Sequence, residues 1–486
     1  MRVTVDRIAP EGQAIAHSKG SNKVIFLPYG NPGDEAEVRI LEERKGYATA
    51  EIISLIKPGP GRIDPPCPHH FKIRDEGRGM RDESKNISPS HNSYLISHIP
   101  QTISGGLWCG GCDWQHLQYP RQLELKKNLV QDALERIGKI KNPPLLDPIP
   151  SPEPWRYRNK VQVPFGMGRG KSLTPSAELR VPTGAPEEPS VLVGFYHPGT
   201  HRIVNFEDCL VQPELSVQIV QKVKQIAQKY RWQPYNEDAQ SGWLRHLFIR
   251  TNEKKEALVA FVTRSPNFPH SKEAIQDLTQ TFPSIISFFQ NIQPLKTSVI
   301  LGPRWIKLWG RDHMEERIGN LHLSVSPEAF LQVNTKATEK LYQQVEEFLK
   351  YGKSIPRNVL DLYCGVGTIS LWVSPLVQQV VGIEENREAV QDAYQNARLN
   401  RVRNVHFLAG KVEYTLPKLD FPSDAVILDP PRQGCQPEVL KKIIKLEARK
   451  VVYVSCNPAT FARDVLVLGQ GGFRLIQVQP VDLFPQ

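Results

Sequence analysis

The order of apolar runs after Pro356 constrains the fold more than any other feature. Strand-like runs occur in NVLDLYCGVG, VVGIEEN, NVHFLAG, AVILDPP and VVYVSC, and a helical pattern over 387–399 lies among them. This alternation predicts an α/β domain, a Rossmann-like doubly wound sheet over residues 331–486. Ligands of such sheets bind beyond the carboxyl ends of the strands, so the residues at those ends are the first candidates for a site.

The first 58 residues have a different pattern. Short alternating segments (RVTVDRIA, KVIFLPY, DEAEVRILEER and ATAEIISLI) are separated by glycine turns and by Asn-Pro-Gly. They predict a small closed barrel of about five strands, the size of OB-like nucleic-acid modules. A barrel used only for packing is the alternative. The run PGPGRIDPP then predicts a stiff linker.

Residues 116–330 predict a central α+β domain. Helical periodicity covers 118–137 and 213–229, and we expect the first of these helices to pack on the C-terminal α/β domain. Strand-like runs include NKVQVPF, VLVGFYH, WLRHLFIRT, EALVAFVT, TSVILG and LHLSVS. Segment 59–115 carries cysteines and a long polar insertion from 71 to 104, and 171–190 predicts a loop.

The charge balance favours a polyanionic partner. The chain has 486 residues and a formal net charge of +10, and clustered Lys and Arg gain affinity by releasing counterions from phosphates. We find neither a secretion signal nor an apolar run long enough for a membrane span. Seven cysteines are too few for a disulfide scaffold in a chain of this length. The expected location is therefore the cytoplasm.

A glycine turn and a carboxylate predict a nucleoside site. In DLYCGVGTIS, Gly365 and Gly367 follow a strand and open a helix, where they let a ligand approach the backbone. Glu384, 17 positions after Gly367 at the end of the next strand, can accept both hydroxyls of a ribose. The simpler alternative is a surface glutamate in a turn.

Two further strand ends carry reactive groups. Asp429 precedes two prolines in LDPPR, which fix the direction of its carboxylate. Cys456 follows the apolar run VVYV and precedes Asn457-Pro458. We expect these groups and the glycine turn to open onto one crevice, which favours a chemical role for Cys456 over simple packing.

Four motifs of this sequence resemble those of the S-adenosylmethionine-dependent RNA uracil-5-methyltransferases. They are DLYCGVG, LDPPRQG and SCNPATFARD, with FLQVN upstream. The barrel is similar to the TRAM domain of the members that act on 23S ribosomal RNA. The resemblance implies that Cys456 is the nucleophile and that Phe330 and Arg432 contact the substrate. It also implies a set of cofactor contacts: Gln332, Tyr363, Gly365, Thr368, Glu384 and Asp429.

This chemistry suits a thiolate. Carbon 5 of uracil is a poor nucleophile, and addition of a thiolate to carbon 6 turns it into an enolate carbon that can attack a sulfonium methyl. Arg432 and Arg463 lie in motifs from which they could lower the pKa of the thiol. A stacked target base must first be flipped out.

The resemblance also implies that four upstream cysteines hold a [4Fe-4S] cluster: Cys67, Cys109, Cys112 and Cys209. Four thiolates can equally hold zinc, which the resemblance makes the less favoured alternative. Nearby histidines (His69, His70 and His116) are spare ligand candidates but are more typical of surface residues. Cys364 and Cys435 are expected to be structural.

The sequence departs from this family at three points. Forty-one residues separate Cys67 from Cys109, where the family has only a handful. Lys411 replaces an acidic or amide residue that the family often has near the adenine. The sequence stops at Gln486, before the His-x-Glu segment in which the family carries the general base and the last strand. Three alternatives therefore remain: a tRNA uracil-5-methyltransferase, a non-catalytic RNA-binding assembly factor, and a cysteine-ligated metal protein with an unrelated α/β domain. We expect a monomer that binds RNA and no membrane.

Overall fold

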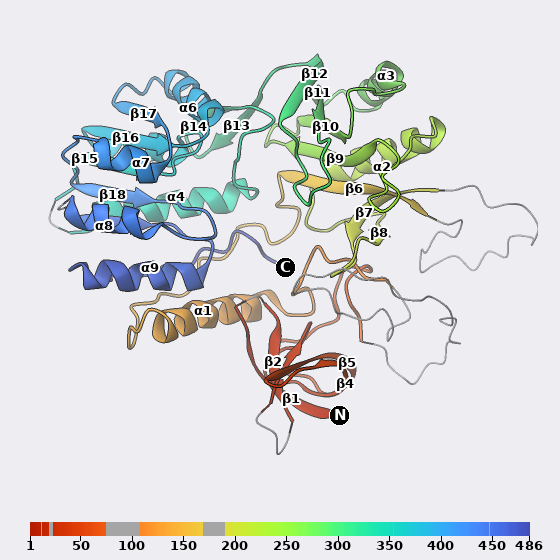
Figure 1. The fold of residues 1–486 in the computed structure, drawn as a ribbon, viewed down its shortest axis with the longest axis horizontal. Helices are drawn as coiled ribbons and strands as arrows, with labels where there is room; N and C mark the ends of the chain where they lie inside the picture. The colour runs from red at the N-terminus through yellow and green to blue at the C-terminus, as the bar shows by residue number, and fades with distance from the viewer. Residues whose placement is uncertain (11, 19–22, 74–106, 169–189, 353, 447) are drawn as a thin grey trace, which may run out of the picture.

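The computed structural model describes residues 1–10, 12–18, 23–73, 107–168, 190–352, 354–446 and 448–486. Figure 1 shows three units: a barrel, a central sheet and a C-terminal sheet. Most of the predicted polar insertion (71–104) and of the predicted loop (171–190) lies outside the described residues. Within the described part, no helix is long and apolar enough to cross a membrane.

The N-terminal unit is a closed five-stranded barrel in the order β1-β2-β3-β5-β4. Its strands are β1 (Arg2–Ile8), β2 (Ala14–His17), β3 (Val24–Leu27), β4 (Glu35–Glu43) and β5 (Tyr47–Lys57). Alternate residues of β1 and β4 are buried, as the period-2 pattern predicts. Buried Asp34 accepts hydrogen bonds from the Arg62 side chain and from the Gly59 N–H, which ties the linker to the barrel. The barrel prediction is confirmed.

The central unit is a seven-stranded sheet in the order β12-β11-β10-β9-β6-β7-β8. Its strands are β6 (Lys160–Gly168), β7 (Ser190–Tyr196), β8 (Ile203–Asn205), β9 (Leu244–Thr251), β10 (Ala257–Thr263), β11 (Ile285–Ile292) and β12 (Arg304–Gly310). Helices α2 (Glu214–Lys229) and α3 (Ser271–Thr281) share its main core. Every residue of β9 and β10 is buried, since these strands occupy the middle of the sheet.

One predicted strand of this unit is wrong. The run TSVILG (297–302) lies in the loop between β11 and β12 and is not a strand. Its backbone carbonyls accept hydrogen bonds from the side chains of Arg245, Gln293 and Asn291. Side chains from elsewhere in the sheet therefore satisfy the groups that a neighbouring strand would otherwise bind, and alternation in the sequence carries no sign of this.

The C-terminal unit is a parallel five-stranded sheet in the order β17-β16-β15-β18-β19. Its strands are β15 (Asn358–Leu362), β16 (Gln379–Glu384), β17 (Val405–Ala409), β18 (Ala425–Leu428) and β19 (Lys450–Tyr453). The helices around it are α4 (Thr335–Lys350), α5 (Thr368–Val373), α6 (Arg387–Leu399), α7 (Val412–Thr415), α8 (Pro437–Lys445) and α9 (Pro458–Gln470), with 3-10 turns η1 (Ser374–Leu376) and η2 (Leu416–Lys418). The hairpin of β13 (Met314–Ile318) and β14 (Leu321–Val325) joins it to the central unit. The predicted Rossmann-like fold is confirmed.

The chain segment from 475 to 486 connects all three units. It follows α9 and ends between the barrel, the central sheet and the C-terminal sheet (Figure 1). Helix α1 (Tyr119–Arg136) packs against α9 through a small core that includes Leu134 and Ala462. Asn334 caps α4 and donates to the Leu483 carbonyl, while Tyr157 of the central unit donates to the Pro485 carbonyl.

Candidate active site and cysteine cavity

The glycine turn after β15 is shaped for close approach of a ligand. Gly365 and Gly367 have φ values of +55° and +79°. A Cβ on Gly367 would lie 2.7 Å from the Phe407 ring, whereas one on Gly365 would meet nothing within 4 Å. The turn therefore packs on one side and is open on the other. Glu384 accepts the Gly365 N–H at 3.0 Å, so the predicted ribose-binding carboxylate does lie at this turn.

Two acidic side chains lie beside the turn. Burial raises the pKa of Asp429 and of Asp361 to about 7, and the neighbouring carboxylate of Asp361 adds to the effect on Asp429. Asp361 Oδ2 accepts a hydrogen bond from Ser370, and its Oδ1 is buried without a partner among the described residues. The sequence analysis missed Asp361, although a carboxylate within the apolar strand VLDL was a usable signal.

The other predicted cofactor residues of the turn have structural partners. The Thr368 hydroxyl, at the start of α5, lies 2.7 Å from that of buried Tyr342 on α4. Tyr363 has φ of +66°, an unusual conformation for a residue with a side chain. Burial and the thiol of Cys435 raise the pKa of Tyr363, so its phenol lies on the Cys435 side of the turn.

The FLQVN segment holds an aromatic ring in solvent. Phe330 is 65% exposed, and Lys160 of β6 lies with its ammonium 5.5 Å from the ring centroid. The backbone on either side is fixed. Buried Arg250 donates to the carbonyls of Ser326 and Ala329, and Asn159 donates to the carbonyl of Gln332. The sequence analysis missed Lys160, Asn159 and Arg250, because β6 and β9 lie far from FLQVN in the chain.

Cys456 is exposed in the loop between β19 and α9. Asn457 caps α9 and donates to the Arg432 carbonyl, so the SCNP loop lies against the DPPR loop. Val454 donates to the Leu428 carbonyl, which places the start of this loop next to Asp429. The two sequence motifs therefore share one edge of the sheet.

The two predicted arginines differ in their surroundings. Arg463 binds Asp464 and the carbonyls of Gln433 and Cys435, so its guanidinium holds the DPPR loop. The Arg432 side chain makes no hydrogen bond or ion pair within the described ranges. Nor does any such bond join Cys456 to another predicted site residue in that part of the chain.

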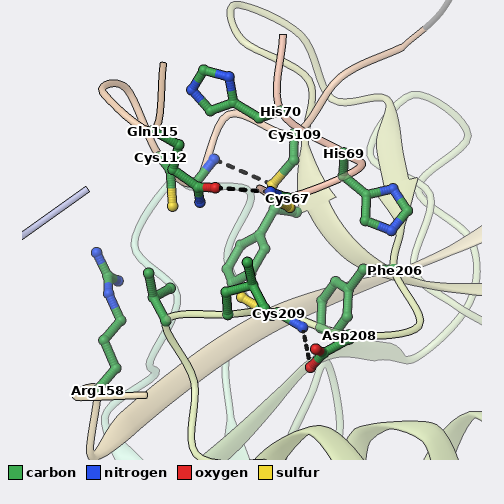
Figure 2. Close-up of a pocket in the computed structure, with 14 residues that line it drawn as sticks. Cys67, His69, His70, Cys109, Cys112, Gln115, Arg158, Phe206, Asp208 and Cys209 are labelled. Atoms are coloured by element: carbon green, nitrogen blue, oxygen red, sulfur yellow. Dashed lines mark hydrogen bonds between the residues drawn. The ribbon is translucent and has the colours of Figure 1, made fainter. Parts of the chain in front are cut away.

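The four upstream cysteines line one cavity of about 40 Å³ (Figure 2). Cys67, Cys109 and Cys112 come from the segment after the barrel, and Cys209 comes from the loop after β8. The Cys109 N–H donates to the His69 carbonyl, which joins the two sides of the 41-residue separation. Arg158 reaches the same cavity from the stretch before β6.

Cys67 is buried in this cavity, and Cys109, Cys112 and Cys209 are partly buried. Burial, and then the neighbouring thiols, raise the pKa of Cys109 to about 12; burial also raises that of Cys112 to about 12. The charge of Arg158 acts in the opposite direction on Cys112 and Cys209. Among the described residues, however, no group of three or more His, Cys, Asp or Glu side chains is arranged to hold a metal ion.

The expectation of surface histidines is wrong for two of the three. His70 and His116 are 4% and 2% exposed and lie in an aromatic cluster with Tyr29. Burial lowers the pKa of His70 to about 4, so it is neutral near pH 7. Their burial arises from the docking of the barrel on the cysteine segment. Cys364 and Cys435 are buried as well.

A parallel sheet with a glycine turn, a glutamate at the end of the next strand and further strand-end carboxylates is typical of nucleoside-binding α/β domains, including the methyltransferases. Comparison with known proteins makes the class specific. Residues 311–486 match the sequence profile of the tRNA (uracil-5-)-methyltransferases, and residues 1–53 match that of the TRAM domain.

Close relatives match over nearly the whole chain. An uncharacterized RNA methyltransferase of Halalkalibacterium halodurans is 34% identical, with 100% of this chain and 94% of that protein aligned. One from Clostridium tetani is 35% identical, with 96% and 90% aligned. Among solved structures, the tRNA (uracil-54, C5)-methyltransferase of Pyrococcus abyssi, in complex with S-adenosyl-L-homocysteine, has the same fold: its TM-score is 0.70 at 24% identity, over 100% of this chain and 97% of that one.

The chain therefore belongs to the TRAM-domain family of RNA uracil-5-methyltransferases. It is an S-adenosylmethionine-dependent enzyme that methylates uracil in RNA.

Proposed function

We propose that this enzyme methylates carbon 5 of a uridine in 23S ribosomal RNA through a covalent adduct with Cys456. One observation carries the nucleophile assignment. All seven cysteines are described, and Cys456 alone is exposed. It lies at the strand end next to Asp429, where RNA can reach it and where the cofactor turn opens.

In the proposed reaction the Cys456 thiol loses its proton and the thiolate adds to carbon 6 of the uracil. Carbon 5 becomes nucleophilic and takes the methyl group, and the sulfonium leaves as a neutral thioether. Removal of the carbon 5 proton by a base restores the 5,6 double bond and expels the thiolate. Phe330 supports this sequence as an exposed ring against which the flipped base can stack.

The residues at the turn fit S-adenosylmethionine, which when bound supplies the electrophilic methyl group. The open side of Gly365 leaves room for the ligand against the backbone. Glu384 is placed to accept ribose hydroxyls, and the unpartnered Asp361 oxygen suits a methionine ammonium. We propose Gln332, Tyr363, Thr368 and Asp429 as further contacts, and Arg432, whose side chain has no partner within the described ranges, as a contact of the RNA.

The test is a labelling experiment with the full chain. Purified enzyme, tritiated methyl donor and either 23S transcript or bulk tRNA are mixed, and RNA and protein are separated under denaturing conditions. We expect label in 5-methyluridine of the 23S transcript, and a denaturation-resistant protein–RNA adduct that is absent in Cys456→Ala. If the enzyme completes multiple turnovers, and neither its activity nor any protein–RNA adduct depends on Cys456, the mechanism is overturned. RNA binding without methylation would favour the assembly factor.

A tRNA substrate is the second candidate. The solved Pyrococcus abyssi enzyme is named for tRNA, and its fold covers this whole chain, including the barrel. A barrel therefore does not by itself separate the two substrates. Label incorporated only into tRNA would replace the ribosomal assignment and leave the role of Cys456 intact.

We also propose that the cysteine cavity holds a [4Fe-4S] cluster. Four thiols from two distant segments around one cavity are the donor set that such a cluster takes. A tetrahedral zinc is the alternative occupant of the same four thiols, and the choice of the iron-sulfur cluster rests on the family resemblance.

Anaerobic purification with iron and sulfide analysis tests this proposal. We expect about four irons per chain and a brown protein, lost in Cys112→Ser. One equivalent of zinc and no iron would overturn it. The remaining parts of the proposal are a cytoplasmic location and a monomer, which gel filtration with light scattering would check.

A further inference from the structure

The outer edge of the central sheet exposes apolar and basic side chains far from the catalytic turn. It consists of β12 and the 293–303 loop that precedes it, which together we call the β12 edge. β12 pairs only with β11 among the described strands. Large hydrophobic side chains are exposed here: Leu295 at 65%, Val299 at 60% and Trp309 at 44%.

The loop is held rigidly although its tip is apolar. Arg245 is 3% exposed, and its guanidinium donates to the carbonyls of Gln293, Leu295 and Thr297 at 2.6–3.2 Å. The Gln293 side chain donates to the carbonyls of Val299 and Leu301. A buried charge that organises three carbonyls of an exposed loop presents Leu295 and Val299 in one preformed arrangement, which lowers the entropy cost of binding.

The charge of this edge selects the class of partner. Residues 293–310 contain no acidic residue and three basic ones, Lys296, Arg304 and Lys307, and Arg311 and Asp312 follow directly. Lys307 and Arg311 form exposed ion pairs with Asp312 and Glu256, which are weak and exchangeable. The side chains of Lys296 and Arg304 have no ion-pair partner within the described ranges. Basic groups on the same strand and loop as an exposed tryptophan are a combination that can bind single-stranded nucleic acid by phosphate contact and base stacking.

The edge belongs to the same sheet as Lys160. Gly310 at the end of β12 shares a cross-strand row with Ser287, Leu258, Arg250 and Lys160. Lys160 lies beside the Phe330 ring. Four strand spacings of about 4.8 Å put the two ends of this row about 19 Å apart. Trp309, however, pairs with Phe288, whose ring packs in the core with α2 and α3, so its ring lies on the opposite face of the sheet from Lys160. RNA bound at Trp309 would therefore reach the target nucleotide around the edge of the sheet.

We propose that the β12 edge binds the RNA substrate outside the active site, with Trp309 stacking on a base and Arg304 contacting a phosphate. This site extends the enzyme's grip to nucleotides flanking the one it methylates. It rests on the family's activity on RNA and is independent of whether that RNA is ribosomal or transfer RNA.

Filter binding and steady-state kinetics test the proposal, using whichever transcript the full-length enzyme methylates. Trp309→Ala should raise Kd and KM for the transcript about tenfold and leave kcat unchanged. Arg304→Ala, at a side chain with no protein partner, should lower the slope of log K against log salt by about 0.7–0.9. The matched control is Lys272→Ala, an exposed lysine on α3, which should change neither quantity.

A short oligonucleotide with only the target loop separates this site from the active site. The variants should bind it as the wild type does, because it cannot reach the β12 edge. Equal losses on the oligonucleotide and the transcript would overturn the proposal, since the defect would then lie in the fold or the active site. Unchanged transcript binding in both variants would also overturn it and would favour a protein partner for this edge. Failure of the ribosomal assignment would appear separately, as methylation of tRNA alone.

Discussion

Cys456 and the four cysteines of the cavity carry the same functional group in opposite surroundings. Cys456 is exposed in a loop at the edge of the parallel sheet, whereas burial raises the pKa of Cys109 and Cys112 to about 12. The proposed nucleophile must reach its substrate, and the proposed ligand set must exclude solvent and competing partners. In this proposal the environment of a cysteine, and not its position in a motif alone, separates a reacting thiol from a binding one.

The largest effect should come from removing the exposed thiol. Cys456→Ala should lower kcat by at least about 10⁴-fold, or about 5 kcal/mol, because no other group can form the carbon 6 adduct. RNA affinity and thermal stability should stay close to those of the wild type. Single-turnover methylation measures the rate of the chemical step, filter binding measures the RNA affinity, and thermal unfolding measures the stability. Cys435→Ala, at a buried cysteine of the same domain, is the control, and equal loss in that variant would remove the distinction.

The cavity should show the opposite profile. Cys112→Ser should lower the free energy of unfolding by about 2–4 kcal/mol, as loss of a metal site or buried network does, with loss of bound iron. Cys456→Ser, at the surface, should change it by less than about 0.5 kcal/mol. Denaturant titration of anaerobic samples compares the two. Equal stability of both variants would mean that the cavity thiols hold nothing that stabilises the fold.

Removal of the exposed Phe330 ring should have an intermediate effect. Phe330→Ala should lower kcat/KM about 10- to 100-fold, the range for loss of one base stack, with little change in Tm because the ring is 65% exposed. Phe484→Ala, at another exposed phenylalanine, is the control. A fall in Tm without a fall in kcat/KM would assign Phe330 a packing role.

The last prediction concerns pH, where the effect within any one pH unit is small. Burial raises the pKa of Asp361 to about 7, above about 3.9 in the unfolded chain, so the folded state binds the proton more tightly. The resulting stability is fully present below about pH 4 and is lost as pH rises through 7, with a slope of at most about 1.4 kcal/mol per pH unit. Asp361→Asn should remove this part.

Subtracting the unfolding curves of Asp361→Asn from those of the ligand-free wild type gives the contribution of this carboxyl together with its effect on the pKa of Asp429, because the other buried groups titrate in both proteins. A difference that stays constant between pH 4 and 8 would contradict the assignment. With S-adenosylmethionine present, affinity should instead rise with pH toward 7, as the ionised carboxylate forms.

Local patterns in the sequence predicted much of the fold. The helix expected over 387–399 has those bounds in the structure, and the helix expected over 213–229 spans Glu214–Lys229. At the edge of the central sheet, 297–302 was predicted as a strand and is a loop between β11 and β12. Alternation cannot reveal that Arg245, more than 50 positions away, binds its carbonyls.

The candidate site was predictable where motifs lie at strand ends and not where distant segments meet. Glu384, Asp429 and Cys456 follow strands of one sheet, so their common edge follows from the topology. The FLQVN segment and the residues just before it are contacted by Lys160 of β6, by Arg250 of β9 and by Asn159, the residue before β6. Only the packing of the central unit on the C-terminal unit brings them there. The burial of His70 and His116 has the same origin.

The connecting segment 475–486 has a consequence for how the protein folds. Tyr119 binds Asp482 across 363 positions, and Tyr157 binds the Pro485 carbonyl across 328. Contacts at such separation form only after the intervening chain is ordered, because closing so long a loop early costs entropy and gains little. We therefore expect the three units to fold separately and then to dock in a late, slow step, with this segment the first to detach when the enzyme is heated.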